Sequence, residues 1–155
     1  MGAAALLAAA GVAACTPAGH APTALLERSP AGLDQVPLTI RSGGHQHGFT
    51  VEVARSPKQQ EIGLMERQQL APDRGMIFPY DPPQPVAFWM KNTLIPLDMV
   101  FIRADGTIAH IAANTVPLSL EPVPAGEPIG AVLEIAGGRS AELGIHAGDT
   151  VEWPH

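Results

Sequence analysis

The polar side chains best suited to chemistry are gathered in one short stretch of an otherwise apolar part of the chain. Lys91, Asn92 and Thr93 follow one another, and Asp98 comes shortly after them. Side chains alternate between the two faces of an extended strand, so a lysine and an aspartate on consecutive strands can meet. Lys91 can then bind an anion while Asp98 acts as a base or orients another group. Trp89 adds a flat surface on which a sugar or a peptide can stack.

The same residue types can also serve the scaffold alone. Asparagine and threonine satisfy backbone groups in turns, an aspartate caps or bridges loops, and a lysine paired with an acid fixes strand register. Lys91 is one of only two lysines, and a lone charge in apolar surroundings is a site candidate. The charged residues Arg74 and Glu134 can join it. The expected pocket comprises Trp89, Lys91, Asn92, Thr93, Asp98, Arg74 and Glu134.

His45 and His47 form a separate pair. Two imidazoles one residue apart lie on the same side of an extended segment, where they can chelate copper or zinc. They follow a glycine-rich turn, and the sequence offers no third ligand beside them. The methionines are more typical of a core than of a metal site. We expect no cofactor and no specific metal site, with His45 and His47 as the weak candidates for one.

The single cysteine closes an apolar N-terminal run. Residues 3–15 read AAALLAAAGVAAC, which is too short for a bilayer span of roughly 20 residues but suits the core of a signal peptide. Val12-Ala13-Ala14-Cys15 resembles the lipobox of bacterial lipoprotein precursors, which implies lipidation of Cys15. No Lys or Arg precedes the run, and an alanine-rich leader with a chance cysteine is the alternative. We expect residues 1–15 to be a signal peptide ending in a lipobox cysteine, and a membrane to be the partner of its lipid anchor.

Composition defines the remaining organisation. Residues 16–35 are dominated by Pro, Gly, Ala and Thr without a sustained period, which predicts a flexible linker. Residues 36–155 suffice for a single globular domain. A net charge of -6 argues against nucleic acid as a partner. Sixteen prolines and sixteen glycines argue against long helices.

A short helix is predicted early in the domain. Ser56-Pro57-Lys58-Gln59 has the pattern of a capping box with proline at the first helical position. The helix would run from Pro57 to about Arg67, with Ile62 and Met65 on its buried side. Gly63 within a helix costs roughly 1 kcal/mol relative to alanine, so we expect another backbone to pack closely against it.

Strands account for most of the remaining domain. Alternation of apolar residues and turn signals predict strands over 36–41, 49–53, 76–78, 86–92, 97–103, 129–135 and 150–153. Asp105-Gly106 is the clearest hairpin turn, and Ser140 to Leu143 can form one helical turn that ends at Gly144. The almost wholly apolar run 129–135 predicts a strand covered on both faces. The expected fold is α+β, mainly β: a small, partly closed β-barrel of seven or eight short strands with one or two short helices.

Four segments, in order, resemble the Domain of Unknown Function 192 family. They are GLM at 63–65, DRGM at 73–76, FWMKNTLIPLD at 88–98 and NTVP at 114–117. The resemblance covers nearly the whole domain. It implies a small β-rich fold with a short helix after the first strands, often exported in bacteria, and it implies neither an activity nor catalytic residues.

The sequence favours an exported protein, periplasmic or membrane-anchored, that acts as a non-catalytic binding or accessory module. Its ligand would be a small molecule, a glycan or a peptide of the cell envelope. A small hydrolase or isomerase acting on an envelope sugar or peptide through Lys91 and Asp98 is one alternative. A periplasmic metal-handling protein that uses His45 and His47 is the other. A binding module predicts a groove beside Trp89, whereas an enzyme predicts a closed pocket around Lys91 and Asp98.

Overall fold

The structure, a computed structural model, describes residue 26 and residues 28–155. The expected signal peptide, Cys15 and most of the expected linker lie outside the described residues. In chain order the elements are β1 (Gln35–Ser42), β2 (His45–Val53), α1 (Pro57–Ile62), β3 (Arg74–Gln84), β4 (Ala87–Phe88), β5 (Leu97–Ile102), β6 (Ile108–Thr115), β7 (Val123–Pro124), β8 (Ile129–Ala136), α2 (Arg139–Leu143) and β9 (Thr150–Glu152). Neither helix in this part of the chain has the length and apolar character needed to cross a membrane.

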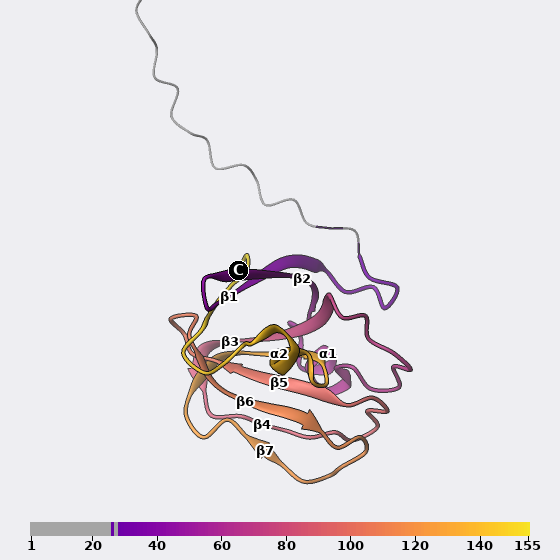
Figure 1. Cartoon of the computed structure of the whole chain (residues 1–155). Coiled ribbons are helices and arrows are strands. Elements are labelled where there is room, and N and C mark those ends of the chain that lie inside the picture. Colours follow the sequence, from indigo (N-terminus) through magenta and orange to yellow (C-terminus); the bar gives the residue numbers. More distant parts are fainter. Residues whose placement is uncertain (1–25, 27) are drawn as a thin grey trace, which may run out of the picture.

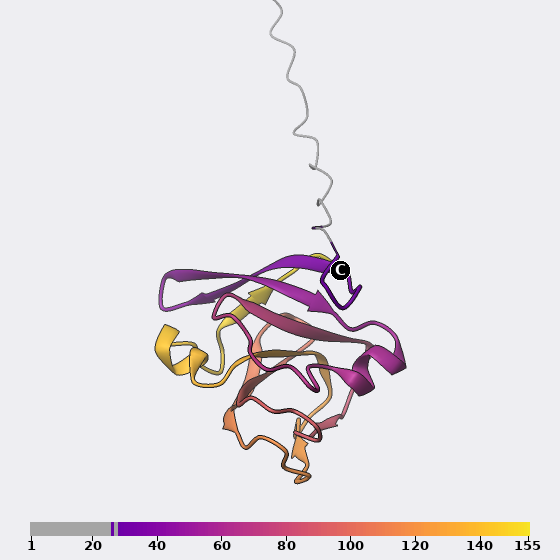
Figure 2. The ribbon, with the colours of Figure 1, turned by 90° about the vertical axis from the view of Figure 1, so that its right-hand side faces the viewer.

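Seven strands form one strongly curled sheet, in the order β6-β5-β8-β3-β2-β1-β9 (Figure 1). Thr107, just before β6, forms a bridge with Thr150 in β9, so the two edges of the sheet meet at one point. The pair β4 and β7 forms a separate ribbon on the far side of the barrel from the β1–β2 hairpin (Figure 2). The expected mainly β, partly closed barrel with two short helices is therefore confirmed, with nine strands in the described residues in place of the expected seven or eight.

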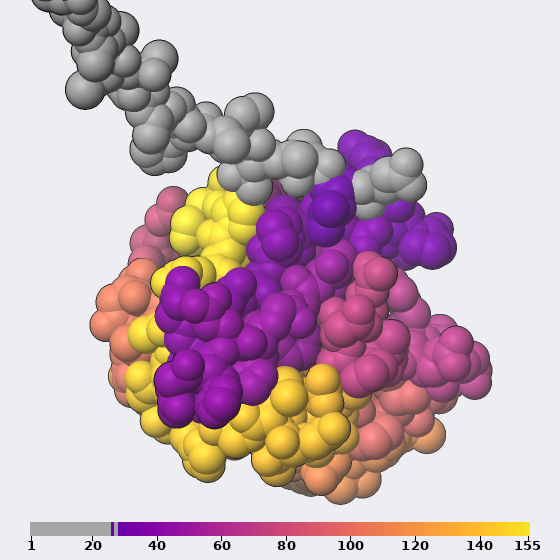
Figure 3. Space-filling view, turned by 45° about the horizontal axis from the view of Figure 1, so that its top comes forward, coloured from indigo at the N-terminus to yellow at the C-terminus, as the bar shows by residue number. Residues whose placement is uncertain are grey.

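Two hairpins are present, one of them at the predicted Asp105-Gly106 turn. β1 and β2 pair antiparallel around Gly43 and Gly44, both of which have positive φ as such tight turns require. β5 and β6 pair antiparallel across a turn in which the Gly106 amide donates to the Arg103 carbonyl at 3.0 Å. β1 also pairs with β9, and the hairpin and the C-terminal segment share one face of the molecule (Figure 3).

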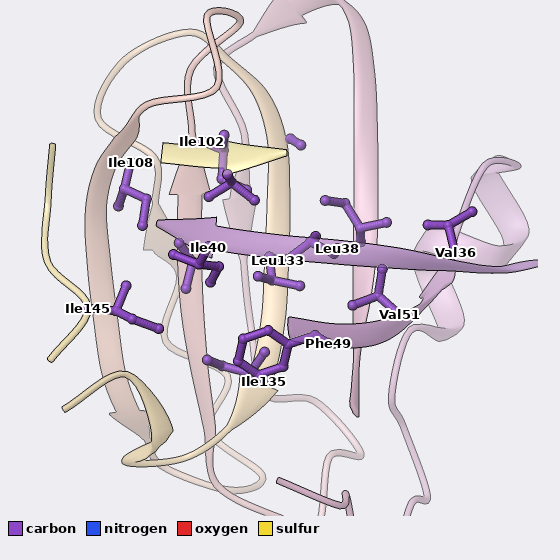
Figure 4. Close-up of a cluster of buried hydrophobic side chains, with 14 of the residues drawn as sticks. Val36, Leu38, Ile40, Phe49, Val51, Ile102, Ile108, Leu133, Ile135 and Ile145 are labelled. Atoms are coloured by element: carbon purple, nitrogen blue, oxygen red, sulfur yellow. The ribbon is translucent and has the colours of Figure 1, made fainter. Parts of the chain in front are cut away.

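The inside of the curled sheet is filled by branched and aromatic side chains from alternating strand positions. Burial of each such side chain contributes roughly 1.5–3 kcal/mol, so this cluster is the main stabilising core. Its principal members are Val36, Leu38, Ile40, Phe49, Val51, Ile102, Ile108, Leu133, Ile135 and Ile145 (Figure 4).

The adjacent strands β5, β8 and β3 carry a second apolar layer on their other face. This layer comprises Met76, Phe78, Met99, Phe101 and Val132, with Leu64 and Met90 packed on it. β8 is thus buried on both faces, which confirms the prediction from its apolar run. Because Leu133 and Ile135 belong to the inner core, alternation places the intervening residue, Glu134, in the second layer.

α1 is shorter than the sequence suggested. The capping box is present, with the Ser56 hydroxyl accepting from the Gln59 amide, but the helix ends at Ile62 because Gly63 takes a positive φ of 49°, which a continuing helix does not allow. Ile62 is 49% exposed, and Leu64 is buried instead. The close neighbour of Gly63 is the Phe78 ring, 3.3 Å from where a Cβ would stand, rather than a backbone.

Two further boundaries differ from expectation. β3 continues through Pro79 to Gln84, with a register shift against β8 in this part, so the proline does not end it. The predicted strand over 86–92 contracts to β4 because the chain turns at Asn92, which has a φ of 55°.

The last part of the expected linker belongs to the domain: Gln35 is the first residue of β1, and Leu33 packs against the second layer.

Candidate functional site

A pocket of about 170 Å³ opens between α1 and β4. Its aromatic lining comes from Phe78 and Tyr80 of β3, Phe88 of β4, and the adjoining Trp89. The Phe78 and Phe88 rings meet edge to face, with centroids 5.1 Å apart, an arrangement that fixes aromatic walls in place. Glu134 of β8 contributes a carboxyl group to the same lining.

Glu134 is the most unusual group in the pocket. Its side chain is 5% exposed, and its neighbours in strand register are Met76 and Met99. No hydrogen bond joins its carboxyl to another described residue. Burial raises the pKa of Glu134 from 4.5 to about 8, so at pH 7 this acid holds its proton and can both donate and accept a hydrogen bond.

Tyr80 is the second titratable group of the pocket. Burial, and then the charge of Glu134, raise the pKa of Tyr80 to about 12. Its hydroxyl therefore remains a hydrogen-bond donor at physiological pH. Tyr80 and Glu134, two of the polar groups in the pocket, are therefore both uncharged near pH 7.

Trp89 stands at the mouth of the pocket and is 47% exposed. The Lys91 ammonium lies over its ring, with Nζ 5.0 Å from the ring centroid, within the range of a cation–π interaction. Trp89 and Lys91 are two residues apart, a spacing that puts side chains on the same side of an extended segment.

The turn that carries Trp89 is held from both sides by backbone hydrogen bonds. The Met90 amide donates to the Ser119 carbonyl at 3.0 Å, and the Thr93 carbonyl accepts from the Leu118 amide at 3.0 Å. The Asn92 carbonyl accepts from the Glu66 amide at 2.9 Å, which ties the turn to the segment after α1. Asn92 therefore supports the turn, while Thr93 also lines the pocket.

Asp98 lies outside the pocket and has a structural role. It is fully buried, and its two oxygens accept from the amides of Asn114, Gly138 and Ser140, each at 2.8 Å, and from the Ser140 hydroxyl. It thus joins β5 to the end of β6 and to the start of α2. The expected ion pair with Lys91 is absent from the described residues, because backbone amides occupy Asp98 while the Lys91 ammonium lies on Trp89.

Arg74 does not join the pocket either. Its Nη1 donates to Gln35 Oε1 at 3.1 Å in a separate groove of about 710 Å³. Glu52 and Arg67 form an ion pair of 2.7 Å that lines the same groove. Of the expected cluster, the structure brings together Trp89, Thr93 and Glu134.

The histidine pair lies at the start of β2. The ring centroids of His45 and His47 are 6.4 Å apart, and the buried His47 Nε2 has no hydrogen-bond partner among the described residues. Within the described part of the chain, no group of three or more His, Cys, Asp or Glu side chains is placed to hold a metal ion. A third ligand for His45 and His47 would have to come from outside these residues or from another molecule.

Comparison with known proteins gives the family. The sequence model of DUF192, described as "Uncharacterized ACR", matches residues 38–153. The chain belongs to the DUF192 family. This confirms the resemblance drawn from the four sequence segments, and it assigns no activity. A search of curated proteins found no match.

Two solved structures of similar chains show the same fold. A protein of unknown function from Novosphingobium aromaticivorans DSM 12444 is 45% identical, with a TM-score of 0.81, over 85% of this chain and 94% of that one. A putative transcription regulator from Sinorhizobium meliloti 1021 is 43% identical, with a TM-score of 0.77, over 78% of this chain and 95% of that one.

Sequence reasoning missed Tyr80, Phe88 and the α1 residues Gln60 and Glu61 as parts of this DUF192 pocket. It named Glu134 only as a companion of Lys91. The available signal was Glu134 itself, the one charged residue in the apolar run 129–135. A strand buried on both faces leaves such a residue in a core position, where an acid without a partner is costly.

Proposed function

We propose that this DUF192 protein is an exported, lipid-anchored, non-catalytic binding module of the cell envelope, and that the pocket around Trp89 and Glu134 holds its ligand. The observation that carries the proposal is the carboxyl of Glu134. It opens into an aromatic pocket and has no hydrogen-bond partner among the described residues. An unpaired buried acid costs stability, and such costs are typical of binding and catalytic sites.

The size of the pocket supports recognition of one part of a larger ligand. At about 170 Å³ it is smaller than the roughly 300–1,000 Å³ typical of sites that enclose a drug-sized molecule. A single ring or a side-chain end group fits inside. The rest of an envelope glycan or peptide would lie across the exposed face of Trp89.

Binding is favoured over hydrolysis or isomerisation by the position of the polar groups. The catalytic alternative relied on Lys91 and Asp98 as partners, and Asp98 is instead saturated by amide donors. A buried neutral acid beside aromatic walls suits a ligand that is held in place by stacking and by one polar contact.

The envelope location is supported by the N-terminal sequence and is compatible with the fold. The apolar run ending at Cys15 has the pattern of a lipoprotein signal. The chain enters the sheet at β1, whereas β4, which borders the pocket, lies on the far side of the barrel (Figure 2). A domain anchored through its N-terminal segment can therefore present the pocket away from the membrane.

The anchor is tested by replacing Cys15 with alanine in the full chain. In a bacterial host, we expect the wild-type protein to incorporate radiolabelled palmitate and to sediment with membranes, because the thiol carries the lipid. The Cys15→Ala variant should lose the label and the association, while a Thr16→Ala control keeps both. A wild-type protein without label would contradict the proposed anchor.

Ligand binding is tested through the two tryptophans. A Trp153→Phe variant leaves Trp89 as the only tryptophan, so its emission should change in a saturable way when soluble muropeptides are added to the full chain in dodecyl maltoside. The matched Trp89→Phe variant, which keeps Trp153, should show no change in emission. In isothermal titration calorimetry it should bind the muropeptides more weakly than wild type, since phenylalanine offers a smaller stacking surface than the indole. If the emission of Trp89 does not change at any muropeptide concentration, or if the emission of both variants changes equally, the proposed pocket is contradicted.

A further inference from the structure

We infer that the ligand of the Trp89–Glu134 pocket carries an organic ammonium group, which enters the pocket and pairs with the Glu134 carboxylate. The inference rests on the proposed function, because it specifies the chemistry recognised by the same site. It predicts a property that a pocket for a neutral sugar lacks: the coupling of binding to the release of a proton.

The charges around the pocket favour a cation. The titratable side chains in its lining are Glu61 from α1, Tyr80 from β3 and Glu134 from β8, and none of the described lining residues is Lys, Arg or His. The basic group nearest in the chain, Lys91, is exposed and lies over the Trp89 ring. An acidic lining in a chain of net charge -6 attracts positive ligands and repels negative ones.

The walls suit an ammonium group as well. Phe78, Tyr80, Phe88 and Trp89 present aromatic surfaces around one small space, and aromatic faces attract alkylammonium and quaternary ammonium ions. The protein itself provides an example of this preference, since the ammonium of Lys91 lies 5.0 Å from the centre of the Trp89 ring.

Glu134 supplies the specific partner. The residues opposite it on the neighbouring strands are Met76 and Met99, so the sheet gives its carboxyl no positive charge. When an ammonium group enters, the carboxylic acid loses its proton to solvent and the resulting carboxylate pairs with the cation. The Glu134 carboxyl is uncharged before binding, and after binding its negative charge is paired with the ammonium, so the large cost of an unpaired buried charge is avoided in both states.

The proton that Glu134 releases provides a measurable signature. With a pKa of about 8 in the empty pocket, Glu134 is protonated in about 0.9 of the molecules at pH 7, and a cation that requires its carboxylate must displace that proton. Affinity should therefore rise about a hundredfold from pH 6 to pH 9. A neutral sugar would use the protonated acid as a hydrogen-bond donor and would release no proton.

The test compares choline with 3,3-dimethylbutan-1-ol, its uncharged isostere. Isothermal titration calorimetry of the full chain in dodecyl maltoside, repeated at pH 7 in buffers of different ionisation enthalpy, gives both the affinity and the number of protons released. We expect choline to bind at least tenfold more tightly than the alcohol, and to release close to one proton. If a variant fails to fold, the rise in the affinity of the wild-type protein for choline from pH 6 to pH 9 tests the inference by itself.

Two variants assign the effect to Glu134. In Glu134→Gln, the proton release and the preference for choline should disappear, whereas Glu121→Gln, an exposed acid in the loop before β7, should behave as wild type. Equal binding of choline and the alcohol, or choline binding without proton release, overturns the ammonium inference and leaves the pocket proposal standing. Failure of choline to bind, in a protein whose Trp89 still responds to muropeptides, overturns the inference in the same way.

Discussion

Replacing Glu134 with glutamine should make the protein more stable than wild type at pH 8 and should flatten its dependence on pH. In the folded state, burial raises the pKa of Glu134 to about 8, against an ordinary value of 4.5. Between these values the unfolded chain gives up the proton while the folded chain keeps it, so the free energy of unfolding falls as the pH rises. The slope is about 1.4 kcal/mol per pH unit, and the effect levels off above pH 8. Glutamine has a similar shape and no proton to lose.

Urea unfolding at pH 5, 6, 7 and 8 measures this effect. The difference in unfolding free energy between Glu134→Gln and wild type should grow across the series by several kcal/mol. The control Glu121→Gln, at an exposed position, should follow the wild-type curve. Parallel curves for wild type and Glu134→Gln would show that Glu134 is not a buried neutral acid.

Asp98→Asn should be strongly destabilising, whereas Lys91→Met should change stability little. Both Asp98 oxygens accept hydrogen bonds from buried donors, and an asparagine must turn an NH₂ group toward donors that it cannot satisfy. Loss of two bonds to a charged group costs about 3–5 kcal/mol. The Lys91→Met variant loses only the exposed cation–π contact with Trp89, which is worth about 0.5–1 kcal/mol.

Denaturant midpoints of the two variants at constant pH provide the comparison. Because the two residues do not form a pair, the double variant should lose the sum of the single effects, as independent sites do. A coupling energy above about 0.5 kcal/mol between Asp98 and Lys91 would contradict their separation in the structure.

Much of the fold could be predicted from local sequence patterns. The turns at Gly43-Gly44 and Asp105-Gly106 fix their hairpins because glycine provides the positive φ that those turns require. The burial of β8 on both faces follows from its nearly continuous apolar run. These features depend on residues close together in the chain, and such features are the most predictable from sequence alone.

The candidate site was less predictable because it depends on which strands become neighbours. β8 lies between β5 and β3, which puts Glu134 beside Met76 and Met99 and into a pocket bordered by α1. No local pattern contains that arrangement. The expected strand over 86–92 was wrong for a related reason: contacts with distant segments, including the Asn92–Glu66 hydrogen bond, hold a turn there.

The stretch from Phe88 to Asp98 therefore combines two roles. Trp89 and Thr93 border the pocket, while Met90 and Asp98 hold the surrounding scaffold through burial and backbone hydrogen bonds. Both interpretations of this stretch were open from the sequence. The structure distributes them among individual residues: the scaffold role applies to Asp98 and the pocket role to Trp89.

The proposed function depends on a buried, neutral carboxylic acid that faces an aromatic pocket. The most direct measurement is an NMR titration of the Glu134 side-chain carboxyl carbon in the full chain, assigned by comparison with Glu134→Gln and followed from pH 4 to pH 10. We expect a midpoint at about pH 8 that choline shifts to lower pH, because the bound ammonium stabilises the carboxylate. A midpoint near 4.5 that choline leaves unchanged would contradict it.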